Sequence, residues 1–126
     1  RIMYTAYKLA HEEFEKENYK EAIKLYQDSI SDMEDMEDTE YIKLPLYNIG
    51  VCYMKLKRFG KALKYLTEAT KIDPKYSKAF FNKGFCHIQL NHNKKALVAM
   101  NTAWALDNND KDCETVINIL LKNFKK

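Results

Sequence analysis

Apolar and small residues recur along this chain at steps of three and four, which is the period of an amphipathic helix rather than of a strand. Ala62, Leu66 and Ala69, for example, share one helix face. The pattern is interrupted by short polar stretches and by Pro74, which cannot continue a helix. It predicts about seven helices, at residues 2–15, 19–31, 41–56 (regular from about 44), 59–72, 76–90, 94–106 and 111–123.

The helical pattern repeats at a fixed offset of 34 residues. The stretch Asn48-Ile49-Gly50-Val51-Cys52 returns as Asn82-Lys83-Gly84-Phe85-Cys86, and Lys61-Ala62-Leu63 returns as Lys95-Ala96-Leu97. A weaker copy lies upstream, where Ala22 precedes Ala62 by 40 residues, so six additional residues separate the first two units. Each unit is predicted to be a pair of helices.

Small residues hold equivalent positions in the units, where two helices are expected to cross closely. They are Ala10, Gly50 and Gly84 on the first helices, and Ala22, Ala62 and Ala96 on the second. A glycine in a helix costs roughly 1 kcal/mol of propensity relative to alanine. We therefore expect Gly50 and Gly84 to be needed for packing.

The period and these residues resemble the tetratricopeptide repeat, a helix-turn-helix unit of 34 residues. In the second unit the resemblance is carried by Leu46, Ile49, Gly50, Tyr53, Phe59, Ala62, Leu66, Ala69 and Pro74. It implies an all-α, right-handed α-solenoid that forms a single domain over residues 1–126. Its three units are expected at about 3–42, 43–76 and 77–110, followed by a capping helix at about 111–124. Because the chain begins at Arg1 rather than Met, we expect it to be a fragment of a longer protein.

The six additional residues fall in an acidic stretch, residues 32–40, which has six carboxylates and no basic residue. A charge run of this kind is typical of a solvated helix end or loop. It lacks the glycine and the ligand order of a calcium-binding EF-hand loop.

Composition narrows the function further. A net charge of +3, with lysines spread over every unit, does not indicate nucleic-acid binding. No apolar run is long enough to span a membrane, and no signal peptide is apparent. Three cysteines without a CxxC motif are expected to be buried, reduced thiols. With no catalytic grouping, metal site or cofactor motif, we expect a non-enzymatic protein of the cytoplasm, with the nucleus as the alternative.

In this family the first helices of the units line a concave groove that receives an extended peptide. The candidate peptide-binding residues implied here are Tyr7, His11, Asn48, Val51, Lys78, Phe81, Asn82 and Phe85. The same helices add Tyr4, Lys8, Leu44, Tyr47, Met54, Lys55 and Gln89. This lining has aromatics, amides and lysines but no acid, which suits a peptide with carboxylates and apolar side chains.

Within the family, the chain is similar to the co-chaperone repeats of FKBP-type prolyl isomerases in its insertion and in two segments, 46–48 and 78–81. Such domains bind the acidic C-terminus, ending EEVD, of heat-shock protein 90 or 70 through five residues called the carboxylate clamp. Asn48 and Lys78 match the clamp. Tyr7, His11 and Asn82 stand where the family has lysine, asparagine and arginine, which should weaken carboxylate binding because two cations are lost.

Other interpretations remain open. The groove could bind an internal apolar peptide or a partner helix, or the chain could associate with itself. A prolyl isomerase domain could lie outside this chain. Asn48 and Asn82 could reflect duplication of the repeat, and Tyr47, Phe81 and Phe85 could serve packing between helices.

Overall fold

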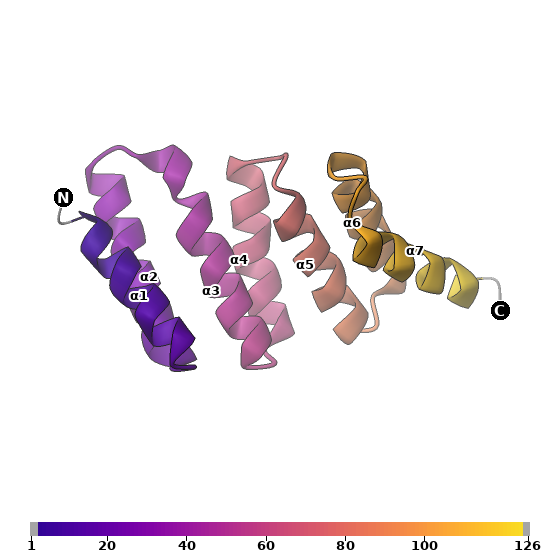
Figure 1. Ribbon diagram of the computed structural model, residues 1–126, viewed down its shortest axis with the longest axis horizontal. Helices are drawn as coiled ribbons and strands as arrows, with labels where there is room; N and C mark the ends of the chain where they lie inside the picture. The colour runs from indigo at the N-terminus through magenta and orange to yellow at the C-terminus, as the bar shows by residue number, and fades with distance from the viewer. Residues whose placement is uncertain (1–2, 125–126) are drawn as a thin grey trace.

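The computed structural model describes residues 3–124, and their side chains from residue 5 onward. This part forms seven α-helices and one short 3₁₀ turn, with no strand. The elements are α1 (Met3–Glu15), α2 (Tyr19–Asp35), η1 (Thr39–Tyr41), α3 (Lys43–Lys55), α4 (Phe59–Ile72), α5 (Ser77–Gln89), α6 (Asn93–Leu106) and α7 (Lys111–Phe124). The helices follow one another in chain order along the molecule (Figure 1). The predicted all-α solenoid is confirmed.

The predicted helix bounds hold within one or two residues except at the C-terminal end of α2. Ile2, the predicted first residue of the first helix, lies outside the described residues. Helix α2 continues four residues beyond Ser31 because Met33 is buried against Ile42 and Leu46. The acidic stretch therefore begins as the last turn of α2 and ends in η1. Helix α3 begins at Lys43, so Pro45 lies in its first turn, where no backbone donor is needed.

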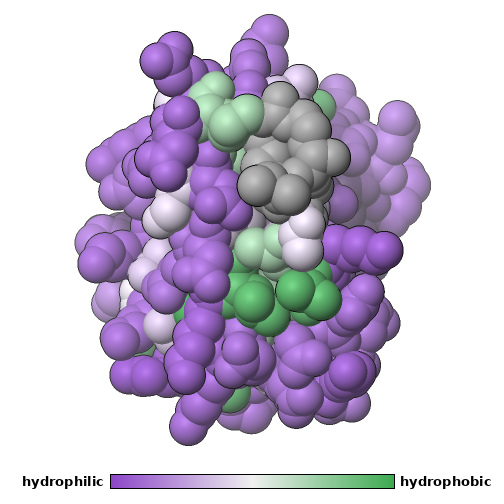
Figure 2. Space-filling view, turned by 90° about the vertical axis from the view of Figure 1, so that its left-hand side faces the viewer, coloured by the Kyte–Doolittle hydropathy of each residue, from purple (hydrophilic) through white to green (hydrophobic). Residues whose placement is uncertain are grey.

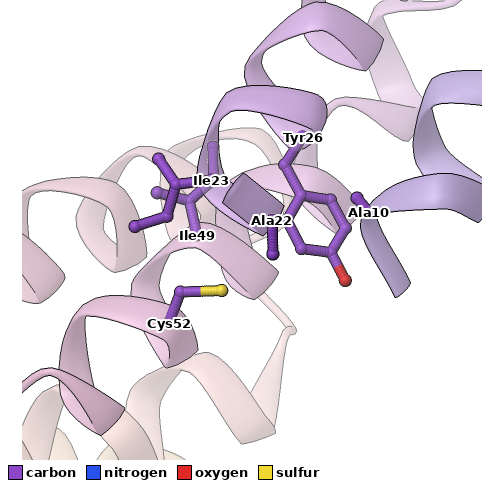
Figure 3. Packing of buried hydrophobic residues seen from close by; sticks show 6 residues of the cluster. All are labelled: Ala10, Ala22, Ile23, Tyr26, Ile49 and Cys52. Atoms are coloured by element: carbon purple, nitrogen blue, oxygen red, sulfur yellow. The ribbon is translucent and has the colours of Figure 1, made fainter. Parts of the chain in front are cut away.

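The core continues from one helix pair to the next. Its first cluster joins α1, α2 and α3 and consists of Ala10, Ala22, Ile23, Tyr26, Ile49 and Cys52. Figure 3 shows the Tyr26 ring between Ala22 and Ala10, with Ile23 beside Ile49. Because Ile49 and Cys52 come from the second pair, this cluster fastens the first pair to the second.

Gly50 and Gly84 lie where side chains of the paired helix leave no room. A β-carbon on Gly50 would lie 2.7 Å from Leu66 Cγ, and one on Gly84 would lie 2.8 Å from Met100 Cε. The expectation that both glycines serve packing is confirmed.

The turn between the two helices of each unit has the same form. Glu17, Lys57 and Asn91 adopt left-handed backbone conformations, with φ of 61°, 59° and 62°. The next residue then donates its backbone N–H to a carbonyl in the last turn, for example Asn18 to Glu13 at 2.9 Å. This arrangement satisfies carbonyls that the helix end would otherwise leave unpaired.

The end of the molecule formed by the first helix pair is hydrophilic over most of its surface and carries a small hydrophobic area (Figure 2). Within residues 3–124 no helix is long and apolar enough to cross a membrane. Cys52, Cys86 and Cys113 are buried free thiols. Burial raises the pKa of both Cys52 and Cys86 to about 12, so these two are unreactive thiols at neutral pH.

Candidate peptide-binding groove

A cavity of about 600 Å³ opens between α3 and α5. It is lined by Tyr47, Val51, Met54, Lys55, Lys57, Phe59, Asn82, Phe85 and Gln89. We call this cavity, together with the adjoining side chains of α1 and α5, the groove. Three of the eight candidate peptide-binding residues line the cavity directly, namely Val51, Asn82 and Phe85. The further groove residues expected from sequence add Tyr47, Met54, Lys55 and Gln89.

The apolar part of the cavity is built from aromatic and aliphatic side chains. Phe85 is 38% exposed and lies edge-on to Phe59, with ring centroids 6.0 Å apart. Val51 and Met54 are half-buried on the opposing helix. An apolar side chain of a ligand would lose water here at both surfaces, which favours its binding.

Two asparagine–tyrosine hydrogen bonds cross from one helix pair to the next. Asn48 Nδ2 donates to the Tyr7 hydroxyl at 3.1 Å, and Asn82 Nδ2 donates to the Tyr47 hydroxyl at 3.0 Å. Each hydroxyl oxygen is the acceptor in its bond, so its own hydrogen can be donated to another group. Burial raises the pKa of Tyr7 and Tyr47, and both therefore remain neutral O–H donors at neutral pH.

Lys78 supplies positive charge at the groove. Its side chain is exposed, and its Nζ lies 5.9 Å from the centroid of the Tyr47 ring. Lys55, the last residue of α3, and Lys57, in the turn that follows, line the cavity, and no acidic residue lines it. The groove therefore presents a positive potential to a ligand.

His11 is tied to the N-terminal end of the core. Its Nδ1 shares a hydrogen bond of 2.8 Å with the hydroxyl of the buried Tyr26. The Tyr7 ring packs edge-on against both, with centroids 4.6 Å from His11 and 5.7 Å from Tyr26. This aromatic group fixes Tyr7 in the position where it meets Asn48.

Phe81 does not line the cavity. It is half-buried and packs against a cluster contributed by α6 and α7, consisting of Ala96, Met100, Ala103, Cys113 and Leu120. Tyr4 lies outside the residues whose side chains are described.

Sequence reasoning missed Lys57 and Phe59 as parts of the lining. Lys57 is the left-handed residue of the turn between α3 and α4, and Phe59 is the first residue of α4. Phe59 is among the residues that carry the repeat resemblance, which was the available signal for its position.

Comparison with known proteins identifies the repeat and the fold. The family model of the tetratricopeptide repeat matches residues 45–76. Bos taurus peptidyl-prolyl cis-trans isomerase FKBP4 is 31% identical over 67 residues, which are 52% of this chain and 14% of that protein. The chain thus spans a small part of the length of this curated relative.

Solved structures match over nearly the whole chain. The first TPR of Spaghetti (RPAP3), bound to the HSP90 peptide SRMEEVD, has a TM-score of 0.87 at 18% identity and covers 98% of this chain and 94% of its own. The C-terminal TPR-containing domain of a Plasmodium falciparum putative FK506-binding protein has a TM-score of 0.84 at 20% identity, and the match covers 98% of this chain and 88% of that one. Residues 45–76 therefore match a tetratricopeptide repeat, and residues 3–124 share the fold of solved tetratricopeptide-repeat (TPR) domains.

Proposed function

We propose that the groove binds the acidic C-terminal peptide of a heat-shock chaperone, which would make this chain the interaction module of a co-chaperone. The observation that carries the proposal is a cavity lined by lysines and apolar side chains without a carboxylate. The likeness to a TPR domain bound to an HSP90 peptide supports the choice of ligand.

The residues divide the ligand into a charged end and an apolar part. Lys78 pairs with the terminal carboxylate, and the Tyr7 and Tyr47 hydroxyls, held by Asn48 and Asn82, donate hydrogen bonds to it. Val51 and Phe85 contact the apolar side chain that precedes it. Tyr7 and Asn82 replace two cations of the family clamp, so we expect binding in the micromolar range or weaker.

Calorimetric titration with a peptide ending in EEVD tests the proposal. One charge-assisted hydrogen bond contributes about 1.5–3 kcal/mol, so amidation of the terminal carboxylate, or Lys78→Ala, should weaken binding at least tenfold. Lys24→Ala changes an exposed lysine of α2 outside the groove and serves as the matched control. Equal binding of the acid and the amide would exclude carboxylate recognition.

Binding of an internal apolar peptide or a partner helix is the second candidate function. It is favoured by the exposure of Phe85 beside Phe59, since an aromatic pair of this kind fits an apolar ligand that lacks a terminal carboxylate. An apolar amidated peptide that binds better than the EEVD peptide would establish it.

We further propose that residues 1–126 form one domain, with the three units and the capping helix at the bounds predicted above. We also propose that this domain belongs to a longer cytoplasmic protein that carries a prolyl isomerase domain. The similarity to FKBP4 supports this. Isomerase activity in the full-length protein, and none in residues 1–126, would agree with it. A full-length protein without isomerase activity, or a tagged protein found mainly in the nucleus, would overturn the corresponding part.

A further inference from the structure

A second hollow lies on the other side of α5 from the groove, because its α5 residues point away from those that line the groove. It has a volume of about 320 Å³ and is lined by Phe80, Lys83, His87, Lys94, Lys95, Val98, Ala99 and Thr102. A neighbouring hollow of about 460 Å³ shares Lys83, His87 and Lys95 and extends to α4 with Gly60, Leu63, Lys64, Thr67 and Glu68. We call the two hollows together the outer cleft.

The outer cleft gathers positive charge without a matching negative charge. Lys64, Lys83, Lys94 and Lys95 line it, and none of these ammonium groups has a carboxylate within 4.0 Å in the described part of the chain. Its one acidic residue, Glu68, has an ion pair of 3.9 Å with a lysine outside the lining. A bound anion would relieve the mutual repulsion of these cations.

Burial and neighbouring cations both disfavour positive charge on two groups of the cleft, His87 and Lys83. His87 Nδ1 lies 3.4 Å from His92 Nδ1. Burial, followed by the proximity of His92 and Lys83, lowers the pKa of His87. Burial, followed by the proximity of Lys71, lowers the pKa of Lys83. Both groups would be charged more readily beside a carboxylate.

The floor of the cleft is apolar. Val98 is 67% exposed in the middle of α6, and it lies with Phe80 and Ala99 in the smaller hollow. Lys83 Nζ lies 5.4 Å from the centroid of the Phe80 ring, so the cation stands over the apolar floor. An apolar ligand side chain inserted here would remove Val98 from water while its flanking groups meet the lysines.

We propose that the outer cleft is a second binding site, and that its occupant is an acidic internal segment of a partner protein with one apolar side chain between carboxylates. Charge complementarity selects an anion, and the apolar floor selects a peptide rather than an inorganic ion. Nucleic acid fits less well, because the two aromatic rings of the cleft, Phe80 and His87, are half-buried and no exposed ring is present on which bases could stack. Occupation of this site leaves the groove free for its own ligand.

The probe is a fluorescently labelled peptide, acetyl-Asp-Glu-Leu-Glu-Asp-amide, which lacks the terminal carboxylate required by the groove. Fluorescence anisotropy should show binding that weakens at least tenfold between 50 and 300 mM salt. A peptide with Asn and Gln in place of the acids should not bind, and one with Ser in place of Leu should bind more weakly.

Two variants locate the site. Lys95→Glu reverses an exposed charge in the first turn of α6, where an acid is tolerated, and should weaken binding at least tenfold. Val98→Asn removes the exposed apolar anchor and should weaken binding about threefold or more. Lys78→Ala, a groove variant, should bind the probe as the unaltered chain does. Both cleft variants should still bind an EEVD peptide in the groove, which keeps this test separate from that of the proposed function.

Several results would overturn the proposal. Failure of the probe to bind the unaltered chain would exclude the site, and so would binding of the probe to Lys95→Glu as tightly as to the unaltered chain. Loss of probe binding in Lys78→Ala would place the probe in the groove.

Other results would change the occupant. Tighter binding of a DNA oligomer at the same lysines would assign the cleft to nucleic acid. The chain's own residues 32–40 are acidic and include Met36, which is 45% exposed. Salt-sensitive self-association in sedimentation, abolished by Lys95→Glu, would make a second copy the occupant instead.

Discussion

At the scale of single residues, substituting glycines at crowded and at open positions distinguishes the effect of packing on stability from the effect of helix propensity. We expect Gly50→Ala to lower the free energy of unfolding by about 1–2 kcal/mol, because the added methyl group would overlap a neighbouring side chain. Its β-carbon would lie 2.7 Å from Leu66 Cγ, and Leu66 is itself fully buried. The overlap outweighs the gain of about 1 kcal/mol in helix propensity. Urea denaturation measures the change.

Gly60→Ala is the matched control on the paired helix. No atom lies within 4 Å of the position of its added β-carbon, so only the propensity term remains. We expect this variant to be more stable by about 0.5–1 kcal/mol. If both Gly50→Ala and Gly60→Ala raised the free energy of unfolding, the position of Gly50 would have room for a methyl group.

The repeat pattern predicts which residues are small more reliably than which polar groups bond. Gly50 and Gly84 could be assigned from sequence because every unit must solve the same crossing of helices. The bond between Asn48 and Tyr7 could not, since it joins groups 41 positions apart and depends on both side-chain conformations.

The predicted groove residues also show that the repeat pattern does not predict the contacts of individual side chains. Phe81 and Phe85 are identical side chains one helical turn apart, yet one packs against α6 and α7 and the other lines the cavity. The neighbouring helices that each ring meets differ, and the repeat pattern of the α5 sequence contains no information about those contacts.

At the scale of helices, the hydrophobic pattern placed α4 at its observed bounds and ended α2 too early. Met33 continues the steps of three and four through Tyr26 and Ser29, so the apolar face of α2 extends into the acidic stretch. The surrounding carboxylates obscured this single apolar position. Composition indicated a solvated helix end or loop, and burial of Met33 between helix pairs favours the helix end, with one further helical turn.

The ion pair between Lys43 and Asp73 links the start of α3 to the end of α4, with Nζ and Oδ2 2.8 Å apart. The hydrogen bond from Lys43 is the main cause of the lowered pKa of Asp73. Because the folded pKa is below the unfolded one, the pair stabilises the fold above the unfolded pKa, and this stabilisation is lost as pH falls through the folded pKa. We expect Lys43→Met to lower the free energy of unfolding by up to about 1 kcal/mol at pH 7, since the pair is partly exposed.

The pH dependence identifies the cause of that loss. Urea denaturation of the unaltered chain and of Lys43→Met should give stabilities that converge as the pH falls through the lowered folded pKa of Asp73, because the carboxyl then becomes protonated and the pair is lost. The pair of Lys71 with Glu68 is longer, at 3.9 Å, and more exposed, so Lys71→Met should have little effect at any pH. A difference for Lys43→Met that persists at pH 2 would instead indicate lost packing of Lys43 over the Tyr76 ring, 5.5 Å away.

At the scale of the whole molecule, α5 separates two surfaces of similar charge and different shape. The groove on one side combines lysines with tyrosine hydroxyls, and the outer cleft on the other combines lysines with an apolar floor. The acidic stretch begins in the last turn of α2 and ends in η1, and none of its residues lines the cleft. The net charge of +3 sums the lysines of the cleft and the acids of residues 32–40, so composition alone gave no indication of a second site.

The solenoid also makes stability local, because helices pack mainly against their neighbours in the chain. Leu120 on α7 is 3% exposed and packs with Met100 and Cys113. Leu120→Ala should cost about 2–3 kcal/mol there. We expect native-state hydrogen exchange to speed up in α6 and α7, while α1 and α2, which exchange through their own local opening, stay unchanged.

Leu121→Ala alters the adjacent, 43% exposed side chain and should leave exchange unaffected throughout. Equal acceleration in all helices by Leu120→Ala would show that the domain instead unfolds as one cooperative unit.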